Sequence, residues 1–164
     1  MASTPESGTA IEAKGTPAET AYPPLIDLYR EAGRRAGHSP EQLTVGIHSV
    51  GFLADTTDEA AEIFFPGYAH TFTEIGKERG WPPATRAQFD VLRGPTGALL
   101  IGDAKTVAKK ILYVNEVLGG ISRVTFQMGV STLPHEKMLH AIEILGTQAA
   151  PIVRNELSVT PVRA

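Results

Sequence analysis

The chain contains no cysteine, and this absence removes several kinds of chemistry at once. Without thiols there are no disulfides, no thiolate metal sites and no cysteine nucleophile. A cysteine-free chain also fits the reducing cytoplasm, where we expect the protein to be found. The only suggestive histidine motif is HEKMLH at residues 135–140, whose two histidines lie five residues apart, on different faces of a helix. We therefore predict no metal site.

Clusters of basic residues and long apolar runs are also missing. The formal net charge is −3, and no Lys/Arg run exceeds two residues, so the chain lacks the electrostatic surface of a nucleic-acid binder. No apolar run approaches the roughly 20 residues of a membrane helix. The N-terminus is polar and lacks the apolar region of a secretory signal. We expect neither nucleic acid nor membrane as partner.

Nucleotide and hydrolase motifs are absent as well. The glycine-rich strings match neither G-x-G-x-x-G nor the P-loop, and no Ser-His-Asp arrangement is legible. The 164 residues, with 42% hydrophobic content, are nevertheless enough for one domain with a substantial core. No catalytic residue can be assigned from such motifs, so the function must be inferred from the fold.

One β-loop-α unit is clearly present at residues 121–146. An apolar strand leads into a Gly/Ser/Thr loop, and Pro134 opens an amphipathic helix. Residues 43–54 alternate in the same way and predict a second strand. Helical segments separate the two strands, which predicts parallel pairing through a right-handed crossover. The predicted class is therefore α/β, with two parallel strands and flanking helices.

The remaining segments predict helices with recognisable ends. Pro23, Thr57, Thr85 and Asp103 mark helix starts, while Pro66-Gly67 should break or kink the second of these helices. Residues 94–102 read as a loop with a brief apolar stretch. We expect a domain over 21–157, a flexible tail at 1–20 and a short tail at 158–164. The composition leaves open whether residues 1–20 order against the sheet.

The two strands each have one apolar and one mixed polar face. Doubly wound parallel sheets are usually apolar on both faces, whereas a barrel strand turns one face inward. We therefore expect His48 and Gln127 to point into a barrel near its top. Ser49, Gly129 and Ser131 should lie at the loop edge. These five are candidate cofactor- or substrate-facing residues, although His48 could equally be satisfied by backbone groups, and the loop could be an ordinary turn.

Three separated blocks resemble the luciferase-like monooxygenases. They are LIDLYREAGRRAGHSPEQLTVGIHSVGFLADTTDEAAEIF, GALLIGDAKTVAKKI and RVTFQMGVSTLPHEKMLHAIEILGTQAAPIVR, within about residues 24–157. The family fold is a (β/α)8 TIM-type barrel, which needs about 250 residues. The resemblance implies that this chain supplies only the last two strands with their helices. The segments TPES and GTPAETA look like those that flank the family's sixth strand, brought close together.

The resemblance implies a flavin-dependent oxidoreductase that uses FMN or a deazaflavin and acts on a small-molecule substrate. In the family most flavin contacts come from earlier strands, so those positions do not exist in this chain. The alternative is a non-catalytic truncated paralogue, acting as an oligomer-forming or partner-docking module. Unpaired strand edges favour either a homo-oligomer or association with another barrel fragment.

Overall fold

A computed structural model describes residues 22–159, so the expected tail at 1–20 lies outside the described part. The described chain alternates helices with short strands. In order, the elements are α2 (Pro23–Arg35), the 3-10 turn η1 (Pro40–Gln42), β1 (Gly46–Leu53), α3 (Thr57–Arg79), α4 (Arg86–Arg93), β2 (Leu100–Gly102), α5 (Ala104–Val117), β3 (Arg123–Gln127), α6 (His135–Ile144), the π-helical segment η2 (Leu145–Ala149) and α7 (Ala150–Val159).

The strands form one parallel sheet in the order β2-β1-β3. The α/β class and the parallel pairing of β1 with β3 are confirmed, but the prediction of two strands is wrong. Residues 94–102 were expected to be a loop, yet Leu100–Gly102 form a third strand beside the end of β1. All three residues are buried, so they show none of the alternation that reveals a strand. The sheet is not closed, which is consistent with part of a TIM-type barrel.

Of the predicted break or kink at Pro66, the break is wrong, because α3 runs unbroken from Thr57 to Arg79, and the kink stays a prediction. Proline inside a helix removes one backbone hydrogen bond and crowds the preceding turn. Buried side chains lie on both sides of it, with Phe64 before and Tyr68 after. This packing holds the two halves in one helix despite the local preference.

The predicted helix starts are confirmed by their capping contacts. The Thr56 hydroxyl accepts from the Glu59 amide at 3.1 Å. The Asp103 carboxylate likewise accepts from the Thr106 amide at 2.8 Å, and Thr85 caps α4. Each cap satisfies an amide that the first helical turn leaves unpaired. The α5 cap directly follows β2, and the α3 cap lies three residues after the end of β1.

The hydrophobic core lies at the carboxyl ends of the strands, between the sheet and helices α3, α5 and α6. The Phe52 and Phe64 rings stack there at 5.2 Å between centroids. The largest fully buried side chains are Phe52, Phe64, Phe89, Leu53, Leu100, Ile101, Ile144 and Val107. Among residues 22–159, no helix combines the length and apolar character needed to cross a bilayer.

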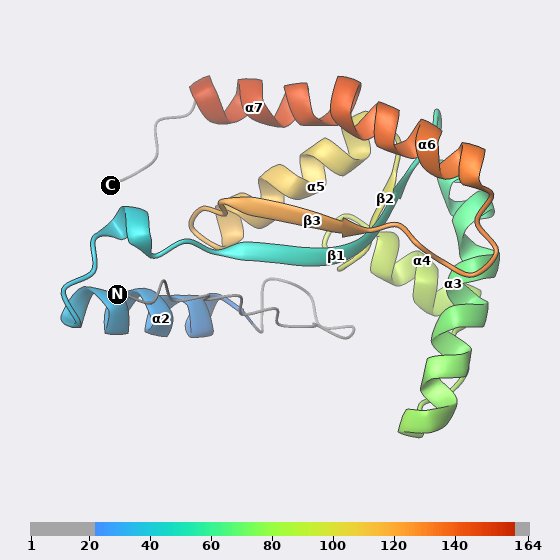
Figure 1. Ribbon diagram of the computed structural model, residues 1–164, viewed down its shortest axis with the longest axis horizontal. Helices are drawn as coiled ribbons and strands as arrows, with labels where there is room; N and C mark the ends of the chain where they lie inside the picture. The colour runs from blue at the N-terminus through green and yellow to red at the C-terminus, as the bar shows by residue number, and fades with distance from the viewer. Residues whose placement is uncertain (1–21, 160–164) are drawn as a thin grey trace, which may run out of the picture.

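The helices are distributed unevenly about the sheet. Figure 1 shows α5, α6 and α7 on one side, while α2 and the far end of α3 extend on the other. Between α2 and α3, the amino-terminal halves of β1 and β3 carry no covering helix (Figure 1). One half of the sheet therefore belongs to the core, and the other half presents an open face.

Phe64→Ala should lower the free energy of unfolding by about 3–5 kcal/mol, because the ring is fully buried against Phe52 and its removal leaves a cavity. Urea unfolding would measure the change. Val91→Ala is the control: this side chain is 75% exposed, so its loss should change stability by less than about 0.5 kcal/mol. Equal effects of the two substitutions would contradict this placement of the core.

Candidate functional site

The open face of the sheet carries the two polar residues predicted to point inward. His48 lies opposite Thr125 in the register, and Val50 lies opposite Gln127. Alternate residues of a strand share a face, so His48 and Gln127 lie on the same one. The His48 ring Nε2 is 3.4 Å from the Gln127 side-chain oxygen, and both side chains are exposed. This pair is the polar centre of the open face.

Ser49 occupies the opposite face, in the middle of β1. Its hydroxyl donates to the Ala98 carbonyl at 2.5 Å and to the Val50 carbonyl at 3.1 Å. The Ala98 contact ties the segment before β2 to β1. Because this hydroxyl is already hydrogen-bonded to backbone carbonyls, the geometry supports a structural role for Ser49 more directly than a ligand contact.

Gly129 and Ser131 lie in the exposed loop after β3, which packs against α3. The Thr71 hydroxyl donates to the Ser131 hydroxyl at 3.4 Å and accepts from the Ser131 amide at 3.3 Å. A side chain at Gly67 would meet Val130, so the loop and α3 approach closely at that point. Neither Gly129 nor Ser131 lines the groove described next. His48, Ser49 and Gln127 are among its lining residues.

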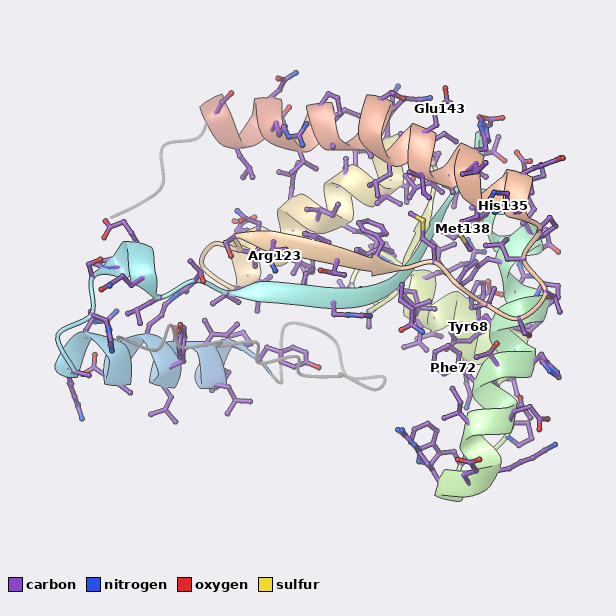
Figure 2. The ribbon with its side chains drawn as sticks, viewed as in Figure 1. Tyr68, Phe72, Arg123, His135, Met138 and Glu143 are labelled. Carbon is purple, nitrogen blue, oxygen red and sulfur yellow. The ribbon has the colours of Figure 1, made fainter. Side chains whose placement is uncertain are left out.

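A groove of about 770 Å³ runs beneath β1, between α2 and the far half of α3. Its lining is mainly apolar and aromatic, with His48, Gln127 and Arg79 among the few polar groups. Figure 2 shows Tyr68 and Phe72 extending from α3 toward the space under the sheet. Their ring centroids are 4.5 Å apart, and burial raises the pKa of the Tyr68 hydroxyl. The groove therefore offers an apolar cavity beside one polar pair.

Sequence reasoning did not identify this aromatic wall. Phe64, Tyr68 and Phe72 follow one another at intervals of four residues, which places them on one stripe of α3. This spacing in the sequence predicts a row of aromatic side chains on one face of the helix. Trp81 also lines the groove, and the Arg79 guanidinium lies 4.9 Å from its ring centroid.

The histidines of α6 belong to a separate surface. His140 Nε2 lies 3.1 Å from the Asp55 carboxylate, and Lys137 pairs with Glu59 at 3.2 Å. These contacts join α6 to the start of α3. His135 and Glu143 lie on α6, away from the space under the sheet (Figure 2). Within residues 22–159, no group of three or more His, Asp or Glu side chains is arranged to hold a metal ion.

A buried lysine supports the rear wall of the groove. Lys110 of α5 is only 4% exposed and donates to the carbonyl oxygens of Leu99 and Arg93. It thereby holds both ends of the segment between α4 and β2, and this segment contributes Gly97 and Ala98 to the groove. Burial, with a smaller contribution from the nearby Arg93 charge, lowers the pKa of Lys110 from its ordinary 10.5 to about 8.

No family model and no curated protein matches this chain. Among solved structures it is similar to the oxygenating constituent of 3,6-diketocamphane monooxygenase from the CAM plasmid of Pseudomonas putida, a type II Baeyer-Villiger monooxygenase in complex with FMN. The TM-score is 0.54 and the identity 21%, over 78% of this chain and 38% of that one. The monooxygenase RslO1 from Streptomyces bottropensis gives a TM-score of 0.60 and 18% identity, over 81% of this chain and 39% of that one.

The fold is shared with two monooxygenases. At these identities the likeness concerns the arrangement of the backbone alone. The chain spans 38% and 39% of the lengths of the two proteins. The similarity agrees with the expected flavin-monooxygenase resemblance at the level of the fold.

Lys110→Met should change the pH dependence of stability. The unfolded chain keeps the lysine proton up to about pH 10.4, whereas the folded protein releases it near pH 8. Between these values the unfolded state binds more protons, so the free energy of unfolding rises with pH. At 1.36 kcal/mol per pKa unit, the rise attributable to Lys110 is about 3 kcal/mol.

Urea unfolding of the wild type and of Lys110→Met, at about pH 7 and about pH 10.5, would measure this difference. The wild type should gain stability relative to the variant at the higher pH. Lys109→Met is the control because Lys109 is exposed. If the free energies of unfolding of the wild type and of Lys110→Met differ by the same amount at both pH values, the buried amine does not titrate in this range.

Proposed function

We propose that this protein is a flavin-dependent oxidoreductase of the luciferase-like monooxygenase type, and that it supplies the last strands of that family's barrel. The observation that carries the proposal is the His48–Gln127 pair on an open sheet face, beside an aromatic groove, in a fold shared with monooxygenases. The binding of FMN in one of these similar structures makes FMN the first cofactor to test, with a deazaflavin second.

The described residues fit the ring system of a flavin. A groove of about 770 Å³ is within the range of small-molecule sites, and its aromatic side chains suit a planar ligand. The Gln127 amide donates and accepts hydrogen bonds, and so does the neutral His48 ring, as the carbonyl and ring nitrogen atoms of a flavin require. A bound flavin supplies the redox chemistry, while the protein orients it and excludes water. Arg79 is the cationic side chain among the lining residues and is suited to an anionic group of the ligand.

Titration of the protein with FMN, and separately with a deazaflavin, should quench the emission of Trp81. This is the single tryptophan of the chain and it lines the groove, so its emission reports on that site. His48→Ala and Gln127→Ala should each weaken binding by about three- to tenfold, the effect of losing one hydrogen bond. His38→Ala and Gln148→Ala are matched controls, since both side chains are exposed outside the groove. The flavin proposal fails if neither cofactor changes Trp81 emission or its own fluorescence.

A second candidate function is a non-catalytic module that docks on a copy of itself or on another barrel fragment. It is favoured by the open sheet. Leu25 and Leu28 of α2 add exposed apolar surface, at 49% and 65% exposure. Under this reading His48 and Gln127 form part of an interface.

Size-exclusion chromatography with light scattering tests this second candidate. A dimer that binds no flavin would support the docking module and argue against the enzyme. Leu25→Lys with Leu28→Lys should shift such a dimer toward monomer, because charged residues are poorly tolerated in an interface core. Val91→Lys is the control at another exposed apolar site. A monomer at all concentrations would remove self-association from consideration.

A further inference from the structure

The central strand β1 has a free edge along its amino-terminal half. β2 pairs only with Gly51, Phe52 and Leu53, and no other strand within residues 22–159 lies on that side. The Ala54 amide donates to Gly102 of β2, whereas the Val45 carbonyl accepts from Ser122 on the β3 side.

Backbone groups of successive strand residues alternate between the two edges. Even-numbered residues of β1 therefore present their N–H and C=O groups toward the β2 side. Gly46 and His48 are both exposed, and on the side that their N–H and C=O groups face, β2 pairs only with the later residues Gly51, Phe52 and Leu53. An exposed row of unpaired strand groups is a template for another extended backbone.

The groove lies along this same edge and has the form of a trough. One wall is formed by residues 44–50, which lead into β1 and include its first half, and the other by Tyr22 with Ile26 and Tyr29 of α2. The Tyr29 hydroxyl reaches the Thr44 carbonyl at 3.5 Å, so α2 lies on the free-edge side. An apolar groove with a backbone edge along it suits an extended polypeptide segment.

The connectivity of the chain indicates which segment this is. Helix α2 leads into β1, and Arg30 fixes it by donating to the carbonyls of Leu118 at 2.8 Å and Gly120 at 2.9 Å. A strand that precedes such a helix and lies parallel to β1 completes a β-α-β unit. Residues 1–21 run directly into Tyr22, which itself lines the groove.

Within that segment, residues 9–13 (TAIEA) contain neither glycine nor proline and include Ile11. Thr and Ile are the residue types here that favour strands. Residues 14–21 give a connection of up to about 26 Å, and a tether this short keeps a weakly pairing segment at about millimolar effective concentration.

We propose that residues 9–13 dock in the groove as a fourth, parallel strand that pairs with the backbone of Gly46 and His48. The segment lies outside the described residues, so the proposal rests on the groove, the free edge and the connection at Tyr22. Docking would cover apolar groove surface and leave the side chains of His48 and Gln127 on the open face. The proposal does not require flavin binding, and the segment would share the groove with any such ligand.

The absence of cysteine permits a direct test in the full chain. His48→Cys is combined with a second cysteine at each of positions 9 to 13 in turn, and the thiols are joined with a short bifunctional reagent. A docked strand turns alternate side chains to one face, so intramolecular cross-linking should be several-fold higher at every second position. His38→Cys replaces His48→Cys in the control series and should give no alternation.

Hydrogen exchange provides a second readout that does not depend on the engineered thiols. Ile11→Pro should accelerate exchange at the Gly46 and His48 amides by about tenfold or more, because docking would no longer protect them. Ala2→Pro should leave both rates unchanged. Uniform or absent cross-linking, or exchange rates that Ile11→Pro does not alter, would overturn the proposal. Cross-links that join two chains would also overturn it and would assign the trough to a second copy.

Discussion

The structure depends on the divided pairing of its central strand. Over Gly51, Phe52 and Leu53, β1 pairs with β2 alone, and these residues are buried. Over residues 46–50 it pairs with β3 alone, and its residues are partly or fully exposed. The first half of β1 therefore provides the candidate site, and the second half anchors the core. A single strand thus links the stability of the domain to the shape of its groove.

The walls of the groove are held by interactions outside it. Phe64 stacks on Phe52 in the core, and Tyr68 and Phe72 continue the same stripe of α3 into the groove. On the opposite side, Lys110 holds the segment before β2 through two backbone carbonyls. Because buried groups fix both walls, the groove should keep its form before any ligand or segment enters. Such preorganisation lowers the free-energy cost of binding.

Much of this fold was readable from the sequence because β1 and β3 each alternate over five or more residues. That alternation also identified His48 and Gln127, which the structure brings together at 3.4 Å. The same rule shows why Ser49 differs: adjacent strand residues point to opposite faces, and its hydroxyl contacts Ala98 instead.

Other elements gave no such signal. The strand Leu100–Gly102 is too short, and too uniformly buried, for a period to show. Tertiary packing keeps α3 continuous through Pro66, and the helix propensity of the local sequence does not reveal that packing. The groove itself arises where α2, α3 and β1 meet, so no single stretch of sequence describes it.

The open face and the free edge require different kinds of partner. The face presents side chains, and a small ligand can satisfy His48 and Gln127 without any extended backbone. The edge presents backbone N–H and C=O groups at Gly46 and His48, whose regular spacing matches another strand. Because side chains and backbone groups leave a strand in perpendicular directions, filling one requirement leaves the other accessible. A strand at the edge would take the α2 side of the groove and leave to a small ligand the side that Tyr68 and Phe72 line.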